Sequence, residues 1–166
     1  MGVAGSRHPR KPASAPGKGR RSSRAVAVAS RADGKAMVFV IPSEPAATRD
    51  VQKQVVQRLE RCGYEDQNLF AIRLALEEGM MNAIKHGNRN DPEKTVRIEA
   101  TVTPRRTEII IEDQGPGFDR TNVPDPCCDE NLLKTSGRGI LLMEAYMDKV
   151  QYTRGGRRVK MTKKNV

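Results

Sequence analysis

Glu78, Asn82 and Lys85 lie close together in a stretch of the chain that can form one helix. At about 100° per residue, an α-helix places these side chains within roughly 60° of one another. Mg²⁺ takes oxygen ligands, and a lysine ammonium meets phosphate as a point charge. This polar face therefore suits a hydrated divalent cation and neighbouring phosphates. The opposite face is apolar and consists of Leu69, Ile72, Leu76, Met80 and Ala83.

These residues also have a simpler interpretation, because a solvated helix face with an i,i+4 pair needs no ligand. Lys85 alone is equally well explained as a solvated side chain. His86, directly before Gly87, is typical of a residue at a helix end. Gly79 costs the helix roughly 1 kcal/mol relative to Ala, which a close approach of a neighbouring strand or a ligand would explain. The other motifs must decide between the two interpretations.

A glycine-rich segment lies further along the chain, where residues 113–118 read Asp-Gln-Gly-Pro-Gly-Phe. Asp113 stands where a predicted strand ends and this loop begins. Gly115 and Gly117 permit positive φ, and Pro116 stiffens the turn between them. On its own, such a loop is a weak signal for a binding site.

A second pair of glycines, Gly137 and Gly139, stands at the start of a predicted helix. The bare N–H groups and the dipole at a helix start favour phosphate. Thr135, Ser136 and Arg138 could add further donors to the same phosphates. This segment therefore has the residue types that a phosphate site needs.

Hydrophobic periodicity predicts the elements that must position these residues. Alternation predicts strands, and the four-residue spacing of Val51, Val55 and Leu59 predicts a helix that ends at Gly63. In order, we expect a strand over 37–41, helices over about 48–62 and 65–86, strands over 96–102 and 107–113, a helix from 137, and strands around 150–152 and 159–161.

This order predicts an α+β fold, a two-layer α/β sandwich with helices on one face of a mixed, largely antiparallel sheet. Residues 119–136 show little periodicity. A structureless segment of this length inside a compact domain is usually functional or mobile, so we expect a lid there.

The formal charge of +10 is unevenly distributed. Residues 1–36 carry nine Lys and Arg against one acid, whereas residues 37–166 carry twenty-one against nineteen. We therefore expect a disordered basic tail over 1–36 and one folded domain over 37–166. A transit peptide, or weak contact of the tail with nucleic acid or another acidic surface, are alternatives for the tail.

The cysteines Cys62, Cys127 and Cys128 have neither disulfide-framework nor zinc-ligand spacing. A reducing cytoplasm is their natural setting. No apolar run approaches the length needed to span a bilayer. We therefore expect a soluble, cytoplasmic protein.

Three segments together carry a resemblance to a known superfamily. They read Glu78-Gly-Met-Met-Asn-Ala-Ile-Lys-His-Gly-Asn88, Asp113-Gln-Gly-Pro-Gly-Phe118, and Ser136-Gly-Arg-Gly-Ile-Leu-Leu-Met143 followed by Met147-Asp-Lys-Val150. In order and spacing they resemble the GHKL ATPases, which include the nucleotide-binding domains of histidine kinases and gyrases. Within that superfamily the chain is most similar to the bacterial anti-sigma-factor serine/threonine protein kinases. The resemblance covers about residues 37–164.

The resemblance implies ATP and Mg²⁺ as cofactors. It implies that Asn82 ligates the magnesium that bridges the ATP phosphates, and that Glu78 is the general base or orients the attacking hydroxyl. The i,i+4 spacing agrees, because phosphoryl transfer needs a metal to gather charge and a carboxylate near the nucleophile. Glu77 is the competing carboxylate, but it points about 100° away on the helical wheel.

The resemblance also gives the glycine-rich loop a role in reading the base. Asp113 looks like the aspartate that accepts a hydrogen bond from the adenine amino group, which would favour adenine over guanine. Gly115 and Gly117 would let the backbone approach the base.

Similar proteins hold a sigma factor inactive and phosphorylate a Ser or Thr on an anti-sigma-factor antagonist, and the resemblance suggests a homodimer. We expect a stand-alone kinase domain, because no dimerisation helix with a phospho-acceptor His and no transducer domain is visible. A nucleotide-dependent binding module without kinase activity is the alternative, although pure binding does not need Glu78. A nucleic-acid-binding protein is the weakest reading, because most of the charge belongs to the tail.

Overall fold

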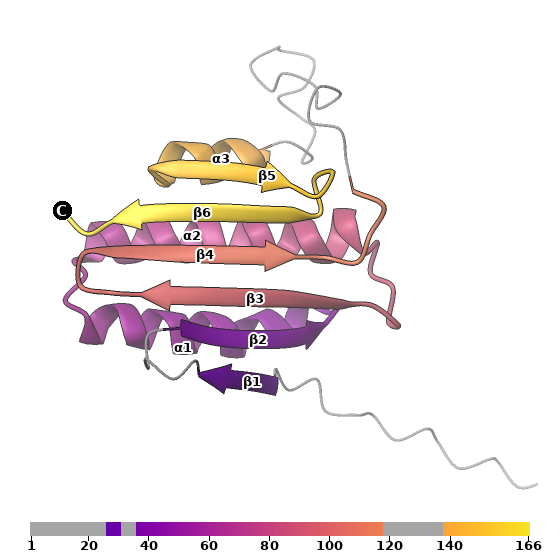
Figure 1. Ribbon diagram of the computed structural model, residues 1–166, viewed down its shortest axis with the longest axis horizontal. Helices are drawn as coiled ribbons and strands as arrows, with labels where there is room; N and C mark the ends of the chain where they lie inside the picture. Colours follow the sequence, from indigo (N-terminus) through magenta and orange to yellow (C-terminus); the bar gives the residue numbers. More distant parts are fainter. Residues whose placement is uncertain (1–25, 31–35, 118–137) are drawn as a thin grey trace, which may run out of the picture.

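The computed structural model describes residues 26–30, 36–117 and 138–166, and only the backbone of the first of these ranges. Helices and strands form two layers in the part of the chain it describes (Figure 1). The elements are β1 (Val26–Ser30), β2 (Ala36–Pro42), η1 (Pro45–Ala47), α1 (Thr48–Arg61), α2 (Asp66–Asn82), η2 (Ala83–Gly87), β3 (Thr95–Val102), β4 (Arg106–Glu112), α3 (Arg138–Tyr146), β5 (Lys149–Thr153) and β6 (Arg158–Lys164).

The six strands form one sheet in the order β1-β2-β3-β4-β6-β5. Each described pairing of neighbouring strands is antiparallel. The predicted α+β sandwich is therefore confirmed. We expected a mixed, largely antiparallel sheet, and each of its described pairings is antiparallel. The chain passes from β4 through α3 to the edge strand β5, and β6 then returns between β5 and β4 as the second strand of a hairpin.

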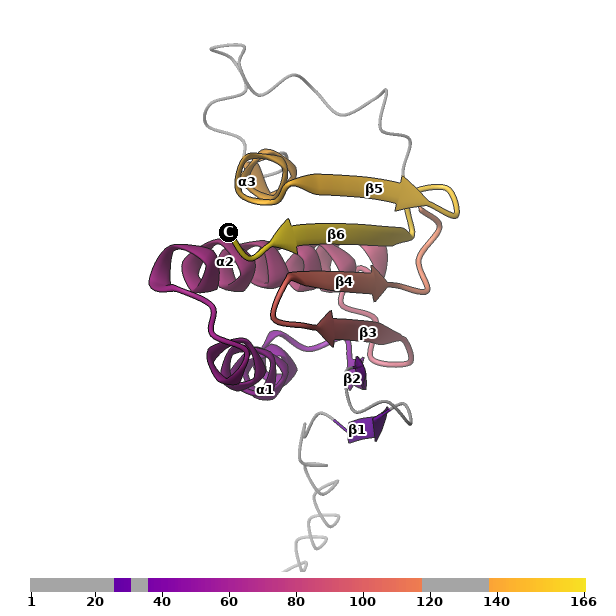
Figure 2. The same cartoon turned by 60° about the vertical axis from the view of Figure 1, so that its left-hand side comes forward.

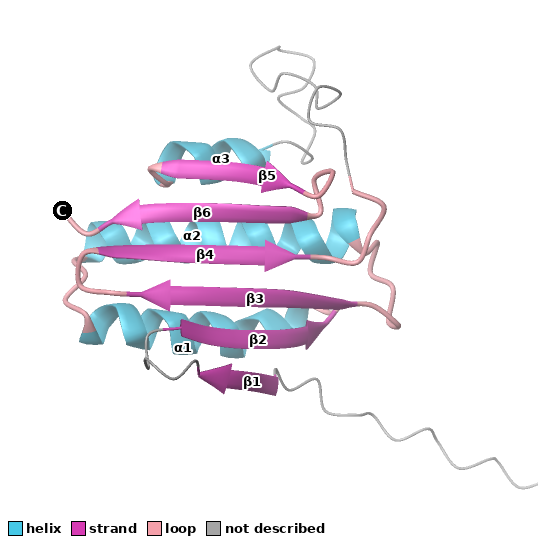
Figure 3. Cartoon of the chain, viewed as in Figure 1, coloured by secondary structure: helices cyan, strands magenta, loops and turns pink. Residues whose placement is uncertain are grey.

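The helices α1, α2 and α3 all lie on the same side of the sheet (Figures 2 and 3). The opposite side of the sheet carries no helix among the described residues. In β3, the buried residues Val96, Ile98, Ala100 and Val102 alternate with more exposed ones, as the sequence predicted. The apolar sides of the helices and of the sheet meet in one core, whose largest fully buried members include Phe39, Leu76, Met80, Ile98, Ile111 and Met161.

Helix α1 follows its predicted pattern closely. Val51, Val55 and Leu59 are fully buried and form the stripe that packs into the core. After the helix, Gly63 has φ of 76°. The N–H of Gly63 donates to the Glu60 carbonyl and that of Tyr64 donates to the Leu59 carbonyl, which is the Schellman pattern of helix ends. Gly63 therefore ends this helix as predicted.

Strand β1 corrects the expected boundary of the tail. We expected residues 1–36 to lack ordered elements, yet Val26–Ser30 pairs antiparallel with β2 at the edge of the sheet. The strand is short and is flanked by Arg-rich and Ser-rich sequence, so composition hid it. Backbone pairing with an exposed strand edge does not require a long apolar pattern.

The lid expected over 119–136 lies outside the described residues. No helix in the described ranges is long and apolar enough to cross a bilayer.

Candidate functional site

The polar side of α2 faces the beginning of α3. Glu78 and Asn82 are half-buried there, whereas Glu77 is exposed. A Cβ atom built on Gly139 would lie 2.5 Å from Oε2 of Glu78 and 3.2 Å from Nδ2 of Asn82. Any side chain at residue 139 would therefore displace both polar groups. The sequence placed these three residues in one site, and the fold brings them together.

This group of atoms fits a cation that is held mostly by a nucleotide. The described residues contain no cluster of three His, Cys, Asp or Glu side chains that could hold a metal ion. Mg²⁺ in kinase sites commonly takes few protein ligands and completes its shell with water and phosphate oxygens. An amide oxygen at Asn82, beside the first turn of α3, is compatible with that arrangement.

Asp113 directly follows β4, and its carboxylate lies against Gly87, the last residue of η2. Its Oδ1 accepts the N–H of Gly115 at 2.8 Å, and its own N–H donates to the Arg157 carbonyl at 3.0 Å. Burial raises the pKa of the Asp113 carboxyl, although the Gly115 N–H and the Arg157 guanidinium oppose this shift. A partly desolvated carboxylate beside a loop of exposed backbone is a candidate for ligand recognition.

Close backbone contacts explain the glycines around Asp113. A Cβ on Gly87 would collide with the Asp113 carboxylate, and a Cβ on Gly115 would collide with the Gly87 carbonyl oxygen. Gly117 has φ of 84° and lies against the Gly155 carbonyl, so its need for glycine is both conformational and steric. Both glycines permit positive φ, but only Gly117 adopts it. Gly115 is required by its close approach to Gly87.

The end of the long helix differs from the regular helix that we expected. From Ala83 to Gly87 the backbone forms a π-helix, η2, rather than a continuation of α2. The helical wheel that grouped Lys85 with Asn82 assumed α-helical spacing, and this spacing ends at Asn82. Lys85 and His86 are both exposed. Single π turns of this kind often occur at functional sites.

The predicted phosphate-binding segment is only partly described. Thr135, Ser136 and Gly137 lie outside the described residues. Arg138 is the first residue of α3 and its side chain is exposed. The positions of Glu78, Asn82 and Gly139 therefore define the phosphate side of the candidate site.

Sequence analysis assigned no role to Asn88, which is fully buried between the two halves of the site. Its Oδ1 accepts the N–H of Gln114 at 2.8 Å, and its Nδ2 lies 2.8 Å from Oγ of Ser43 and 2.9 Å from the Thr95 carbonyl oxygen. Asn88 is the last residue of the first motif and directly follows Gly87, but the motif assigned it no contact. A single sequence could not distinguish this residue from an ordinary turn asparagine.

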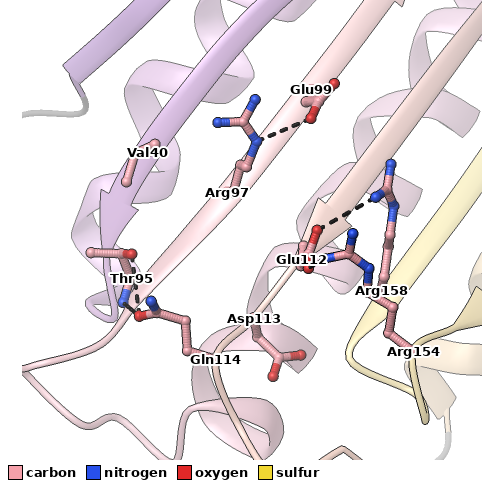
Figure 4. Close-up of a pocket in the computed structure, with 9 residues that line it drawn as sticks. All are labelled: Val40, Thr95, Arg97, Glu99, Glu112, Asp113, Gln114, Arg154 and Arg158. Carbon is pink, nitrogen blue, oxygen red and sulfur yellow. Dashed lines mark hydrogen bonds and ion pairs between the residues drawn. The ribbon is translucent and has the colours of Figure 1, made fainter.

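A separate pocket of about 440 Å³ lies on the open side of the sheet. In Figure 4, Arg97 pairs with Glu99 on one side, and Glu112 lies with Arg154 and Arg158 on the other. Asp113 and Gln114 help to line this pocket, whereas Glu78 and Asn82 do not. The three arginines of this pocket are already paired with the carboxylates of Glu99 and Glu112.

Comparison with known proteins identifies related chains. The serine-protein kinase RsbW of Bacillus velezensis is 30% identical over 130 residues, which cover 74% of this chain and 81% of that protein. The anti-sigma F factor of Clostridium perfringens is 33% identical over 87 residues, which cover 51% of this chain and 62% of that protein.

A solved structure of RsbU and RsbW domains from Mycobacterium tuberculosis is similar in fold. Its TM-score is 0.54 at 17% identity, and the match covers 78% of this chain and 32% of that one. The family model described as the histidine kinase-like ATPase domain matches residues 41–163, which include all three motifs. The chain therefore belongs to the histidine kinase-like ATPase family.

Proposed function

We propose that this chain is an ATP-dependent serine/threonine protein kinase that acts as an anti-sigma factor. In this role it binds a sigma factor and phosphorylates a Ser or Thr of an anti-sigma-factor antagonist, and the two partners compete for it in the cytoplasm. The names of the relatives, serine-protein kinase and anti-sigma F factor, support this proposal. We also propose Mg²⁺ as the metal that accompanies ATP.

The observation that carries the proposal is the convergence of Glu78 and Asn82 on the backbone of Gly139. A site that only bound nucleotide would need a cation ligand and phosphate donors. A half-buried carboxylate beside them adds a group that can take a proton from an attacking hydroxyl. Glu78 is therefore the residue that favours a kinase over a binding module.

Each residue has a part in the proposed chemistry. Asn82 would hold the cation through its amide oxygen, and the first-turn N–H groups of α3 would donate to phosphate oxygens. Glu78 would accept the proton of the substrate hydroxyl or orient that hydroxyl. Bound ATP supplies the phosphoryl group, and bound Mg²⁺ supplies positive charge beside it.

At the other end of the site, Asp113 would select the base. Its Oδ1 accepts a hydrogen bond from the Gly115 N–H. Its Oδ2 would accept a hydrogen bond from the amino group of adenine. Guanine presents a carbonyl oxygen at the corresponding position, which would repel the carboxylate.

Calorimetry of Mg²⁺-dependent ATP binding, combined with radiolabel transfer to candidate antagonist proteins, tests the proposal. We expect Asn82→Ala and Asp113→Asn to lose binding. Glu78→Gln should still bind ATP but transfer phosphate about 10²–10⁴-fold more slowly. The matched control is Glu77→Gln, which changes the exposed neighbouring carboxylate and should behave like the native chain.

Two outcomes would contradict the proposal in different ways. If the native chain bound no adenine nucleotide, ATP-dependent activity of any kind would be excluded. Tight binding without transfer to any antagonist would instead favour the alternative, an ATP-dependent binding module without kinase activity.

A further inference from the structure

Asn88 connects three segments that are distant in the sequence. Its side chain bonds to Ser43 after β2, to Thr95 at the start of β3, and to Gln114 in the loop after β4. Ser43 in turn donates to the Lys94 carbonyl at 3.0 Å. The side chain therefore uses its amide both as a donor and as an acceptor in a site that water does not reach.

The backbone of Asn88 is hydrogen-bonded to η2, which continues α2, the helix that carries Asn82. Its N–H donates to the Ala83 carbonyl at 2.8 Å, which closes the π-helix η2. Because η2 continues directly from α2, the position of Asn88 relative to Asn82 is determined by one rigid element. The backbone of Asn88 is thus held at a fixed position relative to the phosphate side of the site.

The side chain of Asn88 reaches the base side of the site through Gln114. The N–H of Gln114 immediately follows Asp113 in the chain, so the bond at 2.8 Å restrains the peptide that carries the Asp113 carboxylate. The Gln114 side chain is restrained as well, because its Oε1 accepts the N–H of Thr95 at 2.7 Å. Both ends of Gln114 are thereby anchored near Asn88 (Figure 4 shows the bond to Thr95).

We propose that Asn88 is a positioning residue that holds the Asp113 carboxylate at a fixed place relative to Asn82. The inference rests on the proposed function, since it concerns the adenine and phosphate ends of the same ATP molecule. Asn88 does not contact the nucleotide. It sets the distance and the angle between the group that reads adenine and the groups that hold the phosphates.

A purely structural role for Asn88 makes a different prediction. A buried amide that only satisfied its neighbours would affect folding stability, and ATP and GTP affinities would then change together. A positioning role changes the selectivity, because a displaced Asp113 no longer meets the adenine amino group. The ratio of GTP to ATP dissociation constants is therefore the readout that separates the two roles.

The experiment measures ATP and GTP binding to the full chain, native and Asn88→Ala, at a temperature where circular dichroism finds each protein folded. The matched control is Asn68→Ala, which removes another buried amide, one bonded to Asn165 and Val166 at the C-terminus. We expect Asn88→Ala to weaken ATP binding about tenfold or more. We also expect its preference for ATP over GTP to fall by a similar factor, while Asn68→Ala retains both.

A second variant and a measurement on the native chain cover the case in which Asn88→Ala does not fold. Ser43→Ala removes one partner of the amide and should lower the ATP preference in the same direction by a smaller factor. In the native chain, the Gln114 amide should exchange with deuterium at least about tenfold more slowly than in an unstructured peptide.

An unchanged ATP preference in Asn88→Ala, or in Ser43→Ala if only that variant folds, would overturn the inference, as would unprotected exchange at Gln114. If the native chain itself bound no ATP, the proposed function would fail. That result is distinguishable, because it appears before any variant is compared.

Discussion

At the scale of single residues, the partly buried carboxyl group of Asp113 lowers the stability of the folded chain, although the proposed function needs it for binding adenine. Burial raises its pKa above the ordinary value of about 3.9. Between that value and the raised pKa, the unfolded chain releases its proton first, so stability falls as the pH rises through this range. At neutral pH the ionised Asp113 therefore destabilises the folded chain.

We accordingly predict that Asp113→Asn raises the melting temperature at pH 7 in the absence of nucleotide, although it weakens ATP binding. The gain should shrink as the pH falls through the raised pKa, and it should vanish below the ordinary pKa of Asp, where the carboxyl of the native sequence is protonated in both the folded and the unfolded state. Thermal unfolding of both proteins over a series of pH values measures the gain. A stability difference that did not depend on pH would show that burial of charge is not its cause.

The second prediction at this scale concerns Gly139. We expect Gly139→Ala to impair phosphate transfer and ATP binding, since the new methyl group would meet Glu78 Oε2 at 2.5 Å. The fold should survive, because Ala favours a helix by up to about 1 kcal/mol over Gly. Circular dichroism and calorimetry on the same sample separate the two effects. Native-like ATP binding by this variant would mean that residue 139 does not border the nucleotide.

At the scale of elements, the packing of α2 on β4 depends on the missing side chain of Gly79. A Cβ at this position would lie 2.6 Å from Cδ1 of Ile111 and 3.3 Å from Cε of Met161. The close approach that the sequence suggested is therefore made by side chains of the sheet. Glycine lowers the helix propensity of α2 here but lets the helix lie close to the strands.

We predict that Gly79→Ala lowers the free energy of unfolding by about 1–3 kcal/mol through overpacking. Ile111→Val deletes the Cδ1 atom that the new methyl group would meet, and alone it should cost about 0.5–1.5 kcal/mol. The double variant should lose about 1 kcal/mol less free energy of unfolding than the two single variants lose together. Urea unfolding of the four proteins measures this coupling, and additive effects would place the clash elsewhere.

At the scale of the whole molecule, one edge of the sheet lies at β1. Residues 26–30 pair with β2 through the backbone, so their removal would leave unpaired those N–H and C=O groups of β2 that face β1. A truncation at the expected boundary, residue 36, would remove this strand. A chain that begins at Val26 keeps the strand and loses most of the basic residues of the tail.

We predict that a chain of residues 36–166 is less stable than one of residues 26–166 by about 1–3 kcal/mol, because β1 contributes several backbone hydrogen bonds. Deuterium exchange should become faster at the β2 amides that face β1. Equal stability and equal exchange in the two chains would indicate that β1 does not pair with β2 in solution.

Many of the helices and strands, and most of the candidate site residues, could be predicted from patterns that span only a few residues. The spacing of Val51, Val55 and Leu59 defined α1, and alternation from Val96 to Val102 defined β3. The three motifs identified the family, and their residue types indicated phosphate, cation and adenine chemistry. Such signals are readable in one sequence because helix and strand periods are properties of the local backbone.

Tertiary structure decided the features that depend on distant segments. Asn88 and Ser43 are 45 residues apart in the chain, so no local pattern predicts their hydrogen bond. The antiparallel order of the sheet and the pairing of β1 depend in the same way on partners elsewhere in the sequence. The π turn at Ala83–Gly87 and the close contacts that require Gly115 also arise only where α2, β3 and β4 meet. Periodicity specifies which face of an element is buried, but packing specifies which atoms meet there.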